Sequence, residues 1–257
     1  MLIQALLLVL AALAGATAAA QPLARLDHVP VAVRDLDAAV ADYRALGFAI
    51  KPGRPHANGV RNAHIKLRNG AGLELITAPA ARDELSAHYV ALLTQGEGPA
   101  FLTLHAPHEA AAAAALQAAG IAHRREATGI ELTDPALAWV FFTGDNRSPT
   151  DRPEHFAHTN GACATREVWV APDDAAPLAR LLSALGATAV DETRTAPFAV
   201  SARVFELADA SRVVVVPAQH QRLAGRPVIG VALAACDGVA RWWPPAQTHG
   251  LWLGVLR

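Results

Sequence analysis

A strand, a helix and a helix stop follow one another in residues 26–50, LDHVPVAVRDLDAAVADYRALGFAI. Valine alternates with other residues over positions 29–33, as in a half-buried strand. Asp35 is a typical N-cap residue, and the apolar residues that follow it recur at helical spacing. Gly47 is suited to end the helix. Three more strands are expected after it, at 48–50, 63–67 and 73–77.

The same spacing occurs at two later places in the chain. Twelve residues separate Asp35 from Gly47 (47 − 35), and the same separation holds for His108–Gly120 and Asp174–Gly186. An alternating apolar run precedes each first residue, and an Ala/Leu-rich helical pattern fills each interval. This predicts a repeated strand–helix–strand–strand–strand (βαβββ) unit, with a second copy over about 101–143 and a third over about 167–216. A degraded fourth copy is expected over 228–255, because two prolines interrupt the place of its helix.

The copies predict an organisation in two pseudo-symmetric halves. The first and second units occupy 26–143, a Pro-containing linker occupies 144–164, and the third and fourth units occupy 165–257. An additional helix is expected at 81–93.

Composition indicates a globular protein and argues against nucleic acid as a partner. The chain has 257 residues, 53% hydrophobic and 18% charged, enough apolar surface for a core. Its formal net charge is −1, so it lacks the basic field that binds nucleic acid. Nucleophile-elbow, phosphate-loop and Cys-pair zinc motifs are absent from the sequence.

The first 20 residues resemble a secretory signal peptide, with an apolar core and small residues before Gln21. Cleavage near Ala20 predicts a periplasmic or secreted protein without a stable membrane span. Because no Lys or Arg precedes the apolar run, an uncleaved anchor and a misassigned start codon stay open. Export permits a disulfide between the two cysteines, Cys163 and Cys236, but a single pair is thin evidence for a bridge, and two unpaired cysteines that act as small hydrophobic residues are the alternative.

Several motifs resemble the vicinal oxygen chelate superfamily, and within it the glyoxalase-like proteins. They are Leu26-Asp27-His28-Val29, Leu46-Gly47-Phe48, the loop from His56 to Ala63, Leu73-Glu74-Leu75-Ile76 and the junction His158-Thr159-Asn160-Gly161. The resemblance implies an α+β fold of paired βαβββ modules, whose sheets curl into a half-barrel around a cleft. It also implies a divalent metal in the cleft that chelates adjacent oxygens of a small substrate.

The resemblance assigns the metal ligands only in part. His28 and Glu74 match the family's ligand positions on the first and last strands of the first unit, and imidazole and carboxylate suit Zn, Fe, Mn or Ni. In the second unit the same offset falls on Phe101, which cannot bind a metal. The remaining candidates are His105, Glu167 and His158.

We therefore predict His28 and Glu74 as metal ligands, with Glu74 also a candidate general base. The candidate substrate contacts are His56, Asn62, His105, His158 and Asn160. The chemistry expected with a metal is of the lyase, isomerase or dioxygenase type. A metal-free protein that sequesters a small molecule remains the alternative, as does a structural module in which Glu74 forms a salt bridge with Arg61 or Lys66.

Overall fold

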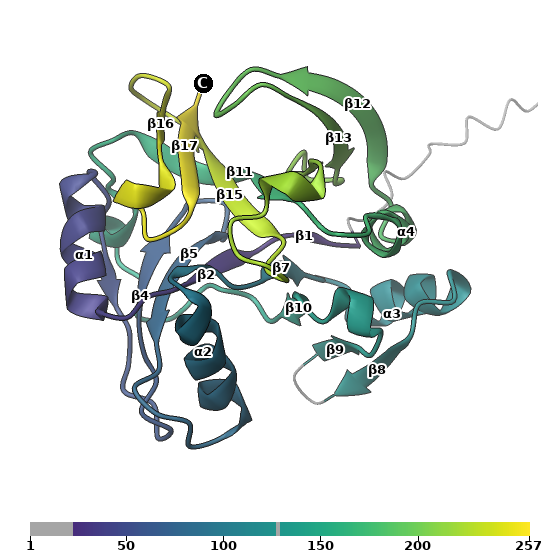
Figure 1. Cartoon of the computed structure of the whole chain (residues 1–257), viewed down its shortest axis with the longest axis horizontal. Helices are drawn as coiled ribbons and strands as arrows, with labels where there is room; N and C mark the ends of the chain where they lie inside the picture. Colours follow the sequence, from purple (N-terminus) through teal and green to yellow (C-terminus); the bar gives the residue numbers. More distant parts are fainter. Residues whose placement is uncertain (1–22, 127–128) are drawn as a thin grey trace, which may run out of the picture.

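The computed structural model describes residues 23–126 and 129–257, and in this part of the chain four units repeat one pairing scheme. In each unit the first strand runs parallel to the last strand and pairs with it: β2 with β5, β7 with β10, β11 with β14 and β15 with β17. Figure 1 shows the four units following one another in colour from purple to yellow. The α+β fold of curled sheets that the resemblance implies is confirmed.

The first unit contains β2 (His28–Ala32), α1 (Leu36–Ala45), β3 (Lys51–Pro52), β4 (Arg61–Lys66) and β5 (Gly72–Thr77). The Asp35 side chain accepts hydrogen bonds from two backbone N–H groups of the first turn of α1, as an N-cap should. Gly47 adopts φ +89°, the left-handed conformation that favours glycine at a helix end.

The second unit contains β7 (Leu102–His105), α3 (Glu109–Ala118), β8 (His123–Glu126), β9 (Gly129–Leu132) and β10 (Val140–Thr143). Its helix α3 begins after His108 and is followed by Gly120 at φ +65°. The strands β8 and β9 form a separate two-stranded ribbon. The repeat spacing thus marks the correct start and end of this helix.

The third unit contains β11 (Ala162–Val170), α4 (Ala176–Ala184), β12 (Thr188–Arg194), β13 (Val200–Glu206) and β14 (Arg212–Val215). The strand β11 begins inside the predicted linker 144–164, before the expected start at Glu167.

The fourth unit contains β15 (Val228–Ala235), β16 (Arg241–Trp243) and β17 (Trp252–Leu256). Between β15 and β17 the structure has β16 and the 3-10 turn Pro245–Gln247 in place of an α-helix. This agrees with the expectation that the fourth copy is degraded.

The two halves assemble their units differently. The third and fourth units share one seven-stranded sheet, in which β11 and β15 pair antiparallel along most of their length. The first unit has its own sheet with β6 (Gly98–Pro99), and the second unit has a three-stranded sheet with β1 (Arg25–Leu26). The chain passes directly from β1, paired with β7, into β2, paired with β5. His28 therefore lies where the chain crosses from one sheet to the other.

Strand alternation separates the core from the opposite face of the first sheet. Val29, Val31 and Leu75 are buried in the main core with Tyr43 of α1. On the other face, Ala32, Ile76 and Phe101 form a smaller apolar cluster with Tyr89 of α2 (Glu84–Gln95). The helix expected at 81–93 is thus present and covers this second face.

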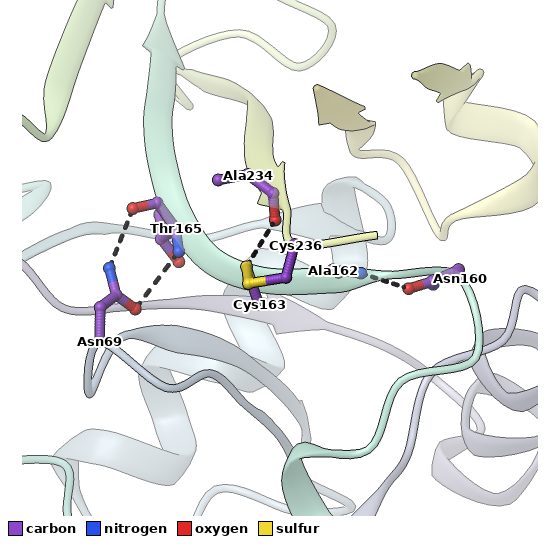
Figure 2. The surroundings of a disulfide bond; sticks show 7 residues. All are labelled: Asn69, Asn160, Ala162, Cys163, Thr165, Ala234 and Cys236. Carbon is purple, nitrogen blue, oxygen red and sulfur yellow. Dashed lines mark hydrogen bonds between the residues drawn. A yellow bond between two sulfur atoms is a disulfide. The ribbon is translucent and has the colours of Figure 1, made fainter. Parts of the chain in front are cut away.

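Cys163 and Cys236 form a disulfide, so of the two possibilities left by the sequence the structure has the bridge. Figure 2 shows it beside the hydrogen bonds between Asn69 and Thr165. Asn69 donates to the Thr165 carbonyl at 3.0 Å and accepts from its N–H at 3.3 Å, while the Arg68 N–H donates to the Cys163 carbonyl at 2.8 Å. The bridge therefore fixes β11 to the end of β15 at the contact between the two halves.

The predicted signal peptide lies outside the described residues. Within those residues, no helix combines the length and the apolar character needed to cross a membrane.

Candidate functional site

A cleft of about 490 Å³ opens between the first unit, helix α2 and the second unit. The first unit contributes His28, Pro30 and Glu74 to its wall. Helix α2 and its cap contribute Asp83, Glu84, Leu85, His88 and Tyr89, and the second unit contributes Phe101, Thr103, Phe141, Phe142 and Thr143. The cleft wall is thus polar at His28 and Glu74 and at the start of α2, and mainly aromatic elsewhere.

The polar end is built around His28 and Glu74, which face each other from neighbouring strands. His28 Nε2 lies 3.2 Å from Glu74 Oε2, and the side chains are only 19% and 13% exposed. Asn62 on β4 donates to the other carboxylate oxygen, Glu74 Oε1, at 2.6 Å. The structure therefore brings together three residues predicted for the site, and it supports the expectation that His28 and Glu74 share one cleft.

Asp27 lies on the other side of the imidazole. Its Oδ2 is 3.6 Å from His28 Nδ1, which is too long for a good hydrogen bond, and Nδ1 is a buried atom without a hydrogen-bond partner. The Thr143 hydroxyl donates to the same carboxylate, and the Thr103 hydroxyl donates to the His28 carbonyl. Both threonines come from the second unit, so its strands help to position the pair.

The two carboxylates keep the imidazole protonated. Burial by itself would lower the pKa of His28, but Asp27 and Glu74 on its two sides outweigh this effect and raise the pKa to about 9. Burial likewise would raise the pKa of Glu74, but His28 and then Asn62 lower it to about 2. At neutral pH the pair is therefore an ion pair.

His64, the cross-strand neighbour of Glu74 on β4, behaves differently. Burial lowers its pKa, and although the charge of Glu74 opposes this effect, the positive charges of His28, Lys66 and Lys51 reinforce it. His64 is therefore neutral beside the charged pair.

The second unit carries two phenylalanines where the first unit carries the pair. His28 lies seven residues before the helix cap Asp35, and Phe101 lies seven residues before the corresponding cap His108. Glu74 pairs with the strand residue two positions after His28, and Phe141 pairs with the residue two positions after Phe101. The rings of Phe101 and Phe141 are in edge-to-face contact, with centroids 4.5 Å apart.

This donor set does not fit the four-ligand metal site that the family resemblance implies. Two of the four positions carry phenyl rings, which offer no lone pair to a metal ion. The other two residues, His28 and Glu74, supply only two donor side chains, and Asn62 already donates to one carboxylate oxygen of Glu74. Within 23–126 and 129–257, no group of three or more His, Cys, Asp or Glu residues is arranged to hold a metal.

Arg61 and Lys66, the salt-bridge partners expected for Glu74 in a structural module, pair with other acidic residues. Arg61 pairs with Asp37 at 3.0 Å, and Lys66 lies 3.5 Å from Asp151. Lys66 is 3% exposed, and Asp151 also pairs with Lys51. Asp151 belongs to the segment between the two halves, which is thereby fixed to β3 and β4.

Four other candidate residues lie away from the pair. His158 uses both ring nitrogens in backbone contacts, accepting from the Ala49 N–H at 3.0 Å and contacting the Lys66 carbonyl at 2.8 Å. Asn160 donates to the Leu46 carbonyl at the end of α1. His56 has a buried Nε2 without a hydrogen-bond partner and is absent from the cleft wall.

His105 lines a different cavity of about 640 Å³, between the halves. Its Nδ1 is 3.1 Å from the Thr143 carbonyl. His105 and Thr103 are two residues apart on β7 and so point to the same side of the strand. Thr103 lines the cleft, whereas His105, at the end of β7, lines the cavity between the halves.

The remaining ligand candidate, Glu167, is in the third unit. It is 1% exposed and is contacted by the guanidinium groups of Arg194 and Arg212 and by the indole N–H of Trp169 at 3.0 Å. Phe198 and Trp242 pack edge-on against Trp169. The C-terminal half thus fills the position equivalent to His28 with an internal ion-pair cluster.

Several residues in or next to the cleft were not predicted from the sequence. Asp27 is adjacent to His28 and was not considered as a partner. Phe141 occupies the position in the second unit that Glu74 occupies in the first. Aligning the last strands of the two units, as was done for His28 and Phe101, could have found it. Tyr89 and Leu85 had no local signal, because α2 reaches the cleft only by tertiary packing.

Comparison with known proteins gives one family match. A family model described as a glyoxalase-like domain matches residues 26–186, which is more than half of the chain. No curated protein matches.

Several solved structures share the fold at low sequence identity. A hypothetical protein from Staphylococcus aureus aligns with a TM-score of 0.63 at 12% identity, covering 91% of this chain and 99% of that one. The Mn(II)-bound glyoxalase from Novosphingobium aromaticivorans aligns at 0.55 and 14%, covering 91% and 82%. Homoprotocatechuate 2,3-dioxygenase from Arthrobacter globiformis aligns at 0.56 and 12%, covering 90% and 79%. At these identities the likeness is one of fold.

Proposed function

The chain belongs to the glyoxalase-like domain family, within the vicinal oxygen chelate superfamily, and we propose that it binds a small organic molecule in its N-terminal cleft without a resident metal. The observation that carries this proposal is the contact between Phe101 and Phe141 at two of the four ligand positions. Two enzymes with this fold, a Mn(II)-bound glyoxalase and a 2,3-dioxygenase, support the proposal that the fold of this chain holds a small-molecule site. The donor set supports the metal-free alternative for this chain.

The cleft has the properties of a small-molecule site. Its volume of about 490 Å³ is within the range of ligand pockets, and its wall combines aromatic side chains with a few convergent polar groups. Phe141 and Leu85 are 42% and 51% exposed, although both are large apolar residues. A ligand that covers them removes apolar surface from water, which drives binding.

We include export in the proposal. The apolar first 20 residues support it, and a structural disulfide such as Cys163–Cys236 is typical of oxidising compartments. The protein would then bind its ligand outside the cytoplasm.

Binding of the neutral fluorescent probe N-phenyl-1-naphthylamine tests the proposal. We expect one probe per chain, the same affinity with and without EDTA, and less than stoichiometric transition metal in untagged protein. Phe141→Ala should weaken binding, whereas the control Val239→Ala, which also truncates an exposed apolar residue, should not. Absence of probe binding would overturn the proposal. So would a stoichiometric metal that Glu74→Gln releases.

A further inference from the structure

We propose that the ligand of the N-terminal cleft is an organic cation: an aromatic or otherwise apolar body that carries one positively charged amine. This inference rests on the proposed function and adds the ligand's charge to it. Three features of the cleft carry it: an excess of negative charge, the lack of lysine and arginine in the described wall, and aromatic rings.

The inner end of the cleft carries a net negative charge. The imidazolium of His28 lies between two carboxylates, 3.2 Å from Glu74 and 3.6 Å from Asp27. One positive and two negative charges leave a net charge of −1 at this end. A carboxylate has about four lone-pair sites, so Glu74 can accept a further N–H from a ligand beside Asn62 and His28.

The mouth of the cleft adds two more carboxylates. Asp83 and Glu84 lie at the start of α2, and both line the cavity. Asp83 is held in place because it accepts from the Asn58 side chain at 2.8 Å and from the Ser86 N–H at 2.8 Å. A cation that enters the cleft therefore passes negative charge at the mouth before it reaches negative charge at the inner end.

Within the described residues, the wall of this cleft contains neither lysine nor arginine. Two cations that interact with residues of the site, Lys66 with Asp27 and Arg226 with His88, are already occupied. Lys66 is held by Asp151, and Arg226 donates to backbone carbonyls that include Gly98 and Pro99. The contrast within the molecule is clear, because the cavity between the halves is lined by four arginines, Arg25, Arg147, Arg166 and Arg212.

Aromatic rings cover the space between the two charged ends. Phe101 lies at the centre of the ring cluster, 4.5 Å from Phe141 and 6.0 Å from Tyr89 between centroids. The faces of such rings attract cations, and the attraction grows when the cation is desolvated. Apolar walls with carboxylates at both ends suit an amine on an aromatic body better than they suit an anion.

Three naphthalene probes of equal ring size and different charge test the inference: 1-naphthylmethylamine, 1-naphthalenemethanol and 1-naphthylacetate. Their affinities would be measured by displacement of N-phenyl-1-naphthylamine from the full chain at low salt. We expect the amine to bind about tenfold more tightly than the alcohol and the acetate to bind weakest. Moderate salt should reduce the preference for the amine.

Charge variants locate the effect. The ratio of amine affinity to alcohol affinity should fall at least about threefold in Glu74→Gln and in Glu84→Gln. The matched control Glu206→Gln, which removes an exposed acid from the other cavity, should keep the wild-type ratio. Because Glu84 is exposed, its variant is expected to fold even where Glu74→Gln does not.

The outcomes separate this inference from the proposed function. Equal binding of the amine and the alcohol, or tightest binding of the acetate, would overturn the cation inference while the cleft remained a binding site. A preference for the amine that survives both cleft variants would also overturn it. Failure of every probe, including the neutral one, would overturn the proposed function itself.

Discussion

His28 and Glu74 form a partly buried ion pair that joins the first strand of the first unit to its last strand, with 3.2 Å between Nε2 and Oε2. In the second unit, the two equivalent positions carry the aromatic residues Phe101 and Phe141. The pair is held from three sides, by Asp27, Asn62 and the hydroxyl groups of the second unit. Its contribution to the free energy of unfolding should therefore depend strongly on pH.

The sign follows from the two pKa values. The pKa of His28 is raised to about 9 in the folded protein, so its stabilisation is complete below the unfolded value of 6.5 and is lost as the pH rises through 9. The pKa of Glu74 is lowered to about 2, so its stabilisation is present above 4.5 and is lost as the pH falls through 2. Between pH 4.5 and 6.5 both contributions are present.

We predict that His28→Gln removes most of the loss in the free energy of unfolding that the wild-type protein shows when the pH rises through 9. Between pH 6 and pH 9.5 the wild-type free energy of unfolding should fall by about 2–3 kcal/mol more than that of the variant. Urea unfolding at the two pH values measures this difference. Parallel pH profiles for the two proteins would mean that the imidazole is not held by the carboxylates.

Arg226 is predicted to hold helix α2 against the cleft. It is 4% exposed, and its guanidinium donates to the carbonyls of Leu92, Gly96, Gly98 and Pro99. Arg226→Met leaves these carbonyls without partners and should destabilise the protein by about 3 kcal/mol or more. Thermal unfolding measures the effect, and the exposed Arg222→Met serves as the control with an expected change within about 0.5 kcal/mol. Similar melting temperatures for the two variants would contradict the role of Arg226.

The disulfide should contribute to stability through the unfolded chain. It closes a segment of 73 residues, and the double substitution Cys163→Ala with Cys236→Ala should cost about 2–4 kcal/mol. Urea unfolding with and without reductant checks this. Reductant should lower the wild-type midpoint and leave the double variant unchanged. A midpoint that responds to reductant in neither protein would show that the bridge is absent or without effect.

Asp151 should fix the segment between the halves to the first unit. Asp151→Asn leaves Lys51 and the buried Lys66 without their charged partner and should cost about 2–4 kcal/mol. Hydrogen exchange should rise in residues 144–157 of the variant more than in the C-terminal sheet. As a control, Asp145→Asn changes an acid of the same segment that is 46% exposed and should have little effect. Unchanged exchange in both variants would mean that this segment is held by other contacts.

The local pattern was sufficient to predict the repeated units, whereas the pairing of His28 with Glu74 followed from the family resemblance. Alternation on β2 places His28 on the face opposite Val29, and the helix caps Asp35 and His108 locate equivalent positions in successive units. These signals lie within a few residues of each other, so a single sequence contains them. The start of β11 was missed because its first residues are ordered by contacts with β15 and the disulfide.

The other contacts of the candidate site depend on distant parts of the chain. Helix α2 is amphipathic on its own, but its place over the cleft depends on Arg226, more than 120 residues away. His158 belongs to a polar junction that resembles a ligand loop. Only the packed structure shows that its two ring nitrogens contact the backbone of Ala49 and Lys66. Sequence spacing cannot predict such contacts, because it carries no information on how separate units dock.

The division of the N-terminal half into two sheets determines how the two walls of its cleft are joined. In the C-terminal half, β11 and β15 are joined by a long antiparallel ladder, so moving one unit against the other would break many hydrogen bonds at once. In the N-terminal half the contact between β2 and β7 rests on a few bonds, among them those from the Asp27 N–H to the Thr103 carbonyl and from the Ala100 N–H to the Pro30 carbonyl. Side-chain packing supplies the rest of that contact: Leu102 and Leu104 of β7 share the main core with Val29 and Val31, and Phe101 packs against Ala32 and Ile76. The two walls of the N-terminal cleft are thus joined mainly by apolar packing, whereas the two C-terminal units are joined by backbone hydrogen bonds.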